Sequence, residues 1–471
     1  MIHSTDDTIC AIATPAGNGG IAVIRVSGTQ AIQVCDTIFT PANTTKSLAT
    51  QPANTTIYGT ITDNNEIIDE VVIAIFRAPH SFTTQDTIEI SCHGSQYIQQ
   101  RIITLLQAKG CRIARPGEYT QRAFTSGRID LSQAEAIADL IAATSSAAHR
   151  LAMNQMRGQF SQRLTELRTQ LLQFVSLIEL ELDFSEEDVQ FADRTHLTTL
   201  TQEIATEINR LAQSFQTGNA IKNGIPVAIV GETNAGKSTL LNHLVHDDRA
   251  IVSDIHGTTR DVIEDTITLG GTLFRFIDTA GIRDTGDTIE TLGIERTFNK
   301  LQQSDIALWL IDSTTSQDNI ITLSQRIIPL CTDKKLIITF NKTDLLDNTQ
   351  LTKIKTLATQ LTQQHPNATA LYISAKNNCG LDTLEQQLIT AAQLPTTDNN
   401  DIIITNARHH NALLLALDAI NRVADGLANN IPTDFIAQDI RETMHHLGEI
   451  TGQISTDEIL GSIFSRFCIG K

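Results

Sequence analysis

Four successive patterns of hydrophobic and polar residues divide the chain. Residues 1–127 mix short β-branched runs, such as residues 21–26 and 71–76, with Gly and Pro turns, which is typical of an α+β domain. In residues 128–220, Pro is absent and Gly is rare. Apolar side chains recur there every three or four positions over residues 153–178, which predicts one long amphipathic helix.

Residues 221–393 alternate short apolar runs with helical stretches. This order predicts a mostly parallel, doubly wound α/β sheet. The predicted strands are residues 225–230, 273–277, 306–311, 336–340 and 370–373. Residues 394–471 return to helical periodicity, with an apolar side formed by Phe435, Ile436, Ile440, Met444 and Leu447.

The helical segments on either side of residues 221–393 each have one apolar face to cover. We therefore expect the α/β segment to be inserted into one all-α domain, whose halves are residues 128–220 and 394–471. Two independent helical pieces are the alternative. The predicted fold class is a multidomain chain with an α+β N-terminal domain, an all-α helical domain and an inserted α/β domain.

Composition narrows the function classes. The 471 residues carry 35 Lys and Arg against 53 Asp and Glu, and a net charge of -18 argues against coating nucleic acid through bulk charge. Residues 101–128 are locally basic, and their cations either contact RNA phosphates or pair within the chain. The seven scattered cysteines form no CxxC pair, and no membrane span or secretory signal is recognisable, so we expect a reduced, cytoplasmic protein.

Residues 231–238 read GETNAGKS, which fits the phosphate-loop pattern G-x-x-x-x-G-K-[ST]. They lie between a predicted strand and a helical run, as that loop requires. Backbone N–H groups of such a loop bind phosphate oxygens, Lys237 places a charge on the outer phosphates, and the Ser238 hydroxyl ligates Mg²⁺.

Three more motifs of a nucleotide site follow in order. Residues 278–281 (DTAG) supply a metal-side Asp and a Gly whose N–H can sense the γ-phosphate. Residues 341–344 (NKTD) end in Asp344, whose carboxylate can accept both N–H donors of guanine, whereas adenine would leave it unpaired. Residues 374–376 (SAK) complete the base contact. The expected nucleotide is therefore GTP and not ATP.

Residues 250–261 form the predicted switch, where a hydroxyl must reach Mg²⁺, and we choose Thr259. Position 282 is Ile, which cannot orient water as a Gln does in Ras-type enzymes. Glu290 is the candidate to hold the attacking water, the alternative being a solvated charge. The residues expected at the nucleotide are Asn234, Ala235, Gly236, Lys237, Ser238, Thr239, Ser253, Asp254, Ile255, His256, Gly257, Thr258, Thr259, Asp278, Thr279, Ala280, Gly281, Asn341, Lys342, Thr343, Asp344, Ser374, Ala375 and Lys376.

Together with motifs outside the α/β segment, these residues make nearly the whole chain resemble the tRNA modification GTPase family MnmE (TrmE). The most specific matches are residues 114–120 (ARPGEYT), running on to residue 136, residues 406–409 (NARH), residues 447–452 (LGEITG) and the C-terminal residues 467–471 (FCIGK). The resemblance implies an N-terminal folate-binding domain at residues 1–127, a helical domain at residues 128–220 and 394–471, and an inserted Ras-like G domain at residues 221–393.

The resemblance also implies a function. Family members are GTPases that form homodimers through their N-terminal domains and partner MnmG, a protein that uses FAD and NADH, in a heterotetramer or larger complex. Together the two proteins add an aminomethyl or carboxymethylaminomethyl group to C5 of the wobble uridine of certain tRNAs. The one-carbon donor is 5-formyl- or 5,10-methylene-tetrahydrofolate, and K⁺-stimulated GTP hydrolysis drives dimerisation of the G domains.

By the same resemblance, K⁺ takes the role of an arginine finger, and Glu290 organises the water. The K⁺ ligands would be Asn234, Ser253, Ile255 and Thr258. A folate site would use Arg25, Glu89, Arg128 and Lys471. A carboxylate suits the N–H donors of a pterin and cations suit its glutamate tail, although without the resemblance these would be ordinary surface ion pairs.

Two other functions stay open. The chain could be a regulatory or ribosome-assembly GTPase without one-carbon chemistry, and capture of ribosomal subunits instead of a flavoprotein would favour that function. It could also be a folate-binding module in which bound GTP is only structural, and a lack of GTP turnover would support that.

Overall fold

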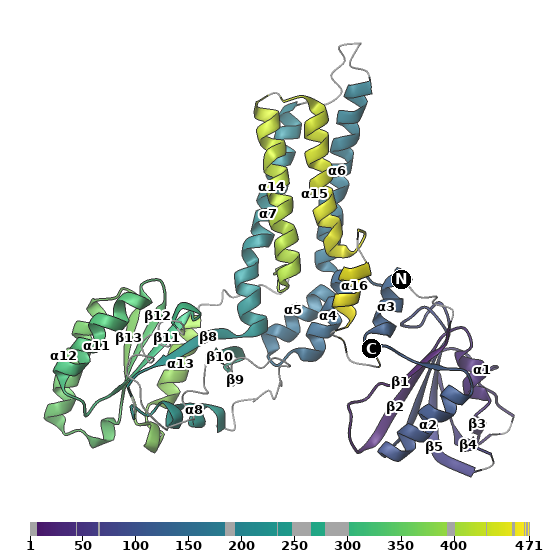
Figure 1. Cartoon of the computed structure of the whole chain (residues 1–471), viewed down its shortest axis with the longest axis horizontal. Coiled ribbons are helices and arrows are strands. Elements are labelled where there is room, and N and C mark those ends of the chain that lie inside the picture. The colour runs from purple at the N-terminus through teal and green to yellow at the C-terminus, as the bar shows by residue number, and fades with distance from the viewer. Residues whose placement is uncertain are drawn as a thin grey trace. The chain divides into compact units, whose positions relative to one another are not determined.

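The computed structural model of the chain describes residues 7–43, 45–64, 66–183, 194–232, 234–246, 265–277, 301–392, 401–429, 431–454, 457–465, 467 and 470. The chain forms two compact units (Figure 1). The first comprises Met1–Ala138, Gln155–Gln202 and Asp418–Lys471, and the second comprises Asp139–Asn154 and Glu203–Leu417. Within the described ranges, every helix is too short or too polar to cross a membrane.

A seven-stranded sheet forms the N-terminal part of the first unit, in the order β3-β4-β5-β6-β2-β1-β7 (Figure 1). The strands are β1 (Ile9–Ile12), β2 (Gly19–Ser27), β3 (Phe39–Pro41), β4 (Thr55–Asp63), β5 (Glu66–Phe76), β6 (Thr87–Gly94) and β7 (Arg112–Ile113). Neighbours are antiparallel except β1 and β7. Alternate residues of β2, β5 and β6 share one apolar core with α1 (Ala31–Asp36) and α2 (Gln96–Ala108), which confirms the predicted α+β pattern.

The prediction of one long helix over residues 153–178 is wrong. The structure has two helices, α5 (Ser146–Met156) and α6 (Gln159–Asp183), separated at Gly158. Gly158 has φ +84°, a left-handed conformation that side chains disfavour, and its N–H donates to Gln155 O at 2.9 Å. This glycine therefore ends α5, although the apolar periodicity continues across it.

Helix α6 packs against α15 (Thr433–Thr451), which comes from the C-terminal segment (Figure 1). Arg168 Nε on α6 donates to Met444 O on α15 at 3.2 Å. Ile436 of the predicted apolar side is buried, but the inclusion of Phe435 is wrong, because this ring is 57% exposed. Neighbouring residues point about 100° apart on a helix, and here Ile436 faces the core while Phe435 lies on the exposed side.

A second pair of helices joins the two sides of the α/β segment, namely α7 (Arg194–Asn223) before it and α14 (Ala407–Ala428) after it. Phe215 stacks on His410 with ring centroids 4.4 Å apart. Gly218 permits close approach of the segment that precedes α14, since a Cβ at Gly218 would lie 2.0 Å from Ile404 O. The helices before and after residues 221–393 thus pack together, as insertion requires, while the domain boundaries stay a prediction.

A six-stranded sheet forms the core of the second unit, in the order β13-β12-β11-β8-β10-β9 (Figure 1). Its strands are β8 (Ile225–Val230), β9 (Asp265–Leu269), β10 (Thr272–Phe276), β11 (Ile306–Asp312), β12 (Lys335–Asn341) and β13 (Ala368–Tyr372). The five predicted strands are confirmed to within two residues and are parallel to their neighbours in this set. Strand β9, which pairs antiparallel with β10, is absent from the prediction.

Helices cover both faces of this sheet, namely α8 (Lys237–His246), α11 (Gln317–Ile327), α12 (Asn348–Gln363) and α13 (Leu381–Ala392). Val227 and Ile229 of β8 face a core shared with α8 and α13. Ala228 and Val230 face a second core shared with α11 and α12. The doubly wound prediction is therefore confirmed, and the carboxyl ends of β8, β11, β12 and β13 meet at one edge of the sheet.

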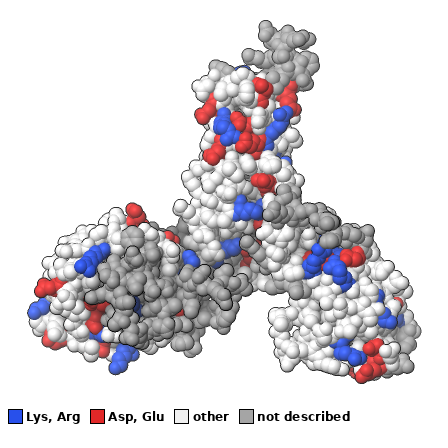
Figure 2. All heavy atoms as spheres, viewed as in Figure 1, with Lys and Arg blue, Asp and Glu red and all other residues white. Residues whose placement is uncertain are grey.

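The locally basic residues 101–128 pair extensively within the chain. Glu118 Oε1 lies 2.6 Å from Arg112 Nη2 and 3.0 Å from Arg122 Nη2. Asp7 contacts the same two guanidinium groups, at 2.7 and 2.5 Å. On the face shown in Figure 2, basic side chains of the described residues lie beside acidic ones instead of forming one continuous basic surface. For Arg112 and Arg122, the structure supports pairing within the chain over contact with RNA.

Glu118→Gln is expected to lower the free energy of unfolding by about 2 kcal/mol at pH 7, because it removes the charge that Arg112 and Arg122 share. Glu118 is 3% exposed. Burial raises its pKa, but hydrogen bonds from Arg112, the Arg115 N–H and Arg122 outweigh burial and hold the pKa at about 2, against 4.5 when unpaired. Its stabilising effect is therefore present above pH 4.5 and is lost as the pH falls toward 2. Urea unfolding of both proteins at several pH values measures this.

Glu66→Gln is the matched control. Glu66 pairs with Arg101 at 3.6 Å, but its side chain is 73% exposed, so we expect a change below about 0.5 kcal/mol. A loss for Glu118→Gln that equals the control, or that stays constant as the pH falls, would contradict the assignment.

Candidate functional site

The phosphate loop connects the carboxyl end of β8 to the first residue of α8. Two of its residues have left-handed backbone conformations, Asn234 at φ +67° and Gly236 at φ +99°. A Cβ at Gly236 would lie 2.3 Å from Asn341 Nδ2, so only glycine fits between the loop and β12. The Lys237 ammonium group donates to Gly231 O and Glu232 O, both at 2.7 Å, and lies against the loop that would hold phosphate.

Asn341 joins the phosphate loop to the base-binding loops. Its Nδ2 donates to Ala235 O at 2.8 Å, and its Oδ1 accepts from Ala375 N at 2.9 Å. Asn341 is 3% exposed, so both bonds are shielded from water. One buried amide therefore fixes three predicted motifs relative to one another, at the carboxyl ends of β8, β12 and β13.

The end of β12 presents the predicted guanine contacts. Lys342 has φ +62°, and its Nζ lies 2.6 Å from Asp312 Oδ2 at the end of β11. Thr343 Oγ1 donates to Ile373 O at 2.9 Å, while Asp344 is exposed. The Asp344 carboxylate is therefore accessible and can accept hydrogen bonds from the N–H groups of a base.

Asp312 belongs to the site but is absent from the residues predicted from the sequence. Burial acts to raise its pKa, but hydrogen bonds from Lys342 and Thr314 outweigh burial and keep the pKa below its ordinary value. Asp312 thus stays charged and orients Lys342. Its position at the end of a predicted strand, level with Asn341 on the neighbouring strand, is the signal that could have identified it.

The remaining nucleotide residues are only partly placed. Ser238 is half-buried in the first turn of α8, Thr239 and Lys376 are exposed, and the buried Ser374 Oγ has no hydrogen-bond partner among the described residues. The predicted site residues that lie outside the described ranges are Ser253, Asp254, Ile255, His256, Gly257, Thr258, Thr259, Asp278, Thr279, Ala280, Gly281, Glu290 and Lys471.

Two of the predicted folate residues form an ion pair in the first unit. Arg25 on β2 lies opposite Glu89 on β6, and its Nε and Nη2 donate to Glu89 Oε1 at 2.9 and 2.8 Å. Arg25 Nη1 also donates to Gly470 O at 3.2 Å, so the residue before the C-terminal Lys471 reaches this pair. Arg128 is exposed, and its N–H donates to Ala123 O.

Tyr119, from the ARPGEYT motif, packs against Arg25 of this pair. It is absent from the predicted folate residues. Its ring is buried beneath the Arg25 guanidinium, 5.5 Å from centroid to carbon, and its hydroxyl donates to Arg25 O at 2.8 Å. Gly117, in the same motif, has φ +67° and approaches Phe464 O so closely that a Cβ would lie 2.8 Å from it. The ARPGEYT motif thus contacts both the N-terminal sheet and the C-terminal segment.

Comparisons with known proteins agree with this architecture. The chain matches two family models, the MnmE helical domain over residues 131–468 and the GTP-binding protein TrmE N-terminus over residues 8–128. A crystal structure of Aquifex aeolicus Era bound to GDP.AlF4- is 27% identical and covers 41% of this chain and 65% of that chain. Its TM-score is 0.26, which is too low to carry an argument.

Full-length relatives are much more similar. The tRNA modification GTPase MnmE of Bacteroides thetaiotaomicron is 58% identical over 465 residues, and the alignment covers 99% of each chain. The protein of the same name from Flavobacterium psychrophilum is 50% identical over 471 residues, again with 99% of each chain covered. These matches and the arrangement of the phosphate loop show that the chain is a GTP-hydrolysing enzyme and that it belongs to the MnmE (TrmE) family of tRNA modification GTPases.

Proposed function

We propose that this chain hydrolyses GTP to drive the modification of C5 of the wobble uridine in certain tRNAs. The product would carry an aminomethyl or carboxymethylaminomethyl group. The observation that supports the GTP part most strongly is the pair of Asn341 hydrogen bonds, which brings the phosphate loop and the base loops together. Family membership supports the tRNA part.

Hydrolysis breaks the bond between the γ-phosphorus and the oxygen that bridges to the β-phosphate, with water as the nucleophile. The N–H groups of the phosphate loop and Lys237 would hold the phosphates, and Asp344 would select guanine. Ser238 fits a Mg²⁺ ligand because its hydroxyl lies in the turn that begins at Lys237, with Thr259 as the second proposed ligand. When bound, Mg²⁺ would neutralise negative charge on the phosphates. Glu290 would position the attacking water.

Asn234 fits the proposed K⁺ site. Its left-handed backbone places an exposed amide side chain on the phosphate loop, where a neutral oxygen ligand can face a monovalent cation. Ser253, Ile255 and Thr258 are the other proposed ligands. Bound K⁺ would supply the positive charge that an arginine finger supplies in other GTPases. Binding of K⁺ would also favour pairing of the two G domains of a homodimer.

GTP turnover is expected to be about tenfold faster in K⁺ buffer than in Na⁺ buffer of equal ionic strength, because a cation at the β/γ oxygens stabilises the transition state. Asn234→Ala should abolish the difference while nucleotide still binds. Steady-state phosphate release measures the turnover. Asn421→Ala, which removes an exposed amide from α14, is the control and should keep the K⁺ effect. Equal rates in both salts for the unmodified chain would overturn the K⁺ proposal.

The proposed one-carbon donor, 5-formyl- or 5,10-methylene-tetrahydrofolate, would bind at Arg25, Glu89, Arg128 and Lys471. Both hydrogen bonds from Arg25 to Glu89 go to Oε1, so the Oε2 atom accepts none from Arg25 and suits a pterin N–H donor. The bond from Arg25 to Gly470 O supports a role for the C-terminus in this site.

The proposed partners are a second copy of the chain, joined through the N-terminal domains, and a flavoprotein of the MnmG type that uses FAD and NADH. Reconstitution of a tagged chain with purified flavoprotein tests the second partner, with purified ribosomal subunits as the competing ligand. A stable heterotetramer or larger complex with the flavoprotein is expected. Binding to ribosomal subunits alone would favour the ribosome-assembly alternative.

A further inference from the structure

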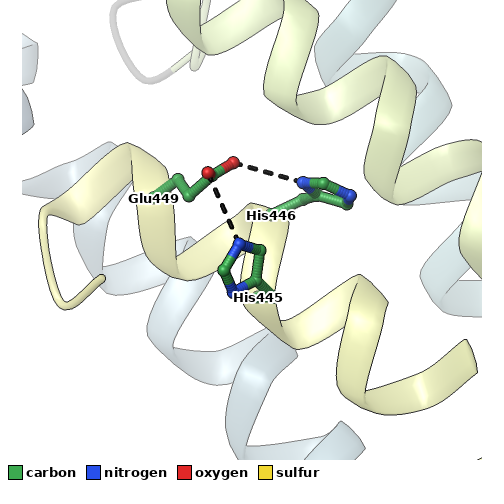
Figure 3. A group of neighbouring side chains, drawn as sticks. All are labelled: His445, His446 and Glu449. Atoms are coloured by element: carbon green, nitrogen blue, oxygen red, sulfur yellow. Dashed lines mark hydrogen bonds and ion pairs between the residues drawn. The ribbon is translucent and has the colours of Figure 1, made fainter. Parts of the chain in front are cut away.

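Three side chains of types that can ligate a metal ion meet on α15 (Figure 3), and none of them is among the predicted nucleotide or folate residues. Glu449 Oε1 lies 3.5 Å from His445 Nε2, and Glu449 Oε2 lies 3.2 Å from His446 Nδ1. Their candidate ligand atoms all lie within 4.8 Å of one another. Glu449 follows the histidines by one helical turn, and this spacing places its carboxylate between the two neighbouring imidazole rings.

A further carboxylate lies near one of these rings. The second ring nitrogen of His446, Nε2, lies 3.8 Å from Glu442 Oε1. Glu442 is itself fixed by Arg422 of α14, whose Nη2 lies 2.6 Å from Glu442 Oε2. The Glu449 carboxylate can only accept a hydrogen bond, so Nδ1 of His446 donates in this contact, and a bound metal ion would replace that proton at Nδ1. A ligating histidine in a metal site commonly has a carboxylate near its other ring nitrogen.

We propose that His445, His446 and Glu449 bind a divalent transition-metal ion of the Zn²⁺ type. Two imidazole nitrogens and one carboxylate oxygen suit Zn²⁺ or Co²⁺, whereas Mg²⁺ and Ca²⁺ prefer all-oxygen sites. Three protein ligands leave a position for water. The ion would replace the two His–Glu contacts and join consecutive turns of α15 close to its end at Thr451.

Co²⁺ absorption spectroscopy tests the site on the full chain, after treatment with a chelator and in nucleotide-free buffer with excess Mg²⁺. One equivalent of Co²⁺ should produce visible ligand-field bands, which Zn²⁺ should then remove. Glu449→Gln and His446→Gln should each weaken Co²⁺ binding by at least about tenfold. His196→Gln removes an exposed histidine from α7 and should bind Co²⁺ like the parent chain.

A melting experiment gives a second readout that separates loss of the site from loss of the fold. Zn²⁺ should raise the Tm of the parent chain and of His196→Gln, because an ion that binds only the folded state stabilises it. It should leave the Tm of Glu449→Gln unchanged, while circular dichroism confirms that this variant is folded. Equal Co²⁺ binding by the parent and Glu449→Gln, or no Co²⁺ bands in the parent, would overturn the proposal.

Discussion

Asp344→Asn is expected to lower the affinity for GTP about 1,000-fold, because the site loses a carboxylate that accepts both N–H donors of guanine. An amide in its place presents one oxygen acceptor and one NH₂ donor, so that one guanine N–H would face another donor. The fold should be unaffected, since Asp344 is exposed at the end of β12. Isothermal titration calorimetry measures the dissociation constants of GTP and GDP.

Xanthosine triphosphate distinguishes lost recognition from lost folding. Xanthine carries a carbonyl where guanine carries its amino group, so the amide NH₂ of the variant has an acceptor to meet. The affinity for xanthosine triphosphate should therefore rise in Asp344→Asn, while the affinity for GTP falls. Asp333→Asn, an exposed change just before the amino end of β12, should leave both affinities unchanged. An equal loss of both nucleotides in Asp344→Asn would contradict the assigned role.

Gly236→Ala is expected to weaken GTP binding about as much as Asp344→Asn does. The cause is strain in the loop backbone and not the loss of a group that contacts the nucleotide. The residue has φ +99°, and an added Cβ would lie 2.3 Å from Asn341 Nδ2. To avoid this clash, either the loop backbone must adopt a strained conformation or the buried Asn341 amide must move. That amide is hydrogen-bonded to Ala235 O and Ala375 N. Backbone strain and a broken buried hydrogen bond together cost about 4 kcal/mol, or about 1,000-fold in affinity.

Gly461→Ala is the matched control for this prediction. Gly461 lies within α16 (Asp457–Phe464), and a Cβ added there meets nothing within 4 Å. Alanine in a helix interior should stabilise the chain by about 0.5 kcal/mol and leave GTP binding unchanged. Fluorescent-nucleotide binding and thermal melting of both variants measure these effects. GTP binding by Gly236→Ala at the parent's affinity would contradict the packing described for the loop.

The nucleotide site is predictable from the sequence because its chemistry is local. Each motif follows an apolar run, and the carboxyl ends of parallel strands meet at one edge of a sheet, so the order of motifs along the chain already places them together. The structure adds how they are held. The Asn341 bonds to Ala235 and Ala375 span 106 and 34 residues, and no periodicity in the sequence reports such contacts.

Other features escape sequence reasoning for identifiable reasons. Gly158 interrupts an apolar stripe that reads as continuous, because hydrophobic spacing does not record a single left-handed residue. Strand β9 is short and antiparallel, so it lies outside the strand–helix alternation that identifies the parallel strands. The bond from Arg25 to Gly470 O joins residues 445 positions apart, and only the resemblance to a family suggested that these ends belong to one site.

The measurement that tests the central claim most directly is mass spectrometry of wobble uridine after reconstitution. The full chain, the flavoprotein partner with FAD and NADH, a tetrahydrofolate one-carbon donor, GTP, Mg²⁺ and K⁺ would be incubated with unmodified tRNA. We predict a new C5-substituted uridine whose formation requires GTP hydrolysis and is lost with Lys237→Ala. Continued GTP hydrolysis with the uridine unchanged, or the same product from Lys237→Ala, would contradict a GTP-driven tRNA modification enzyme.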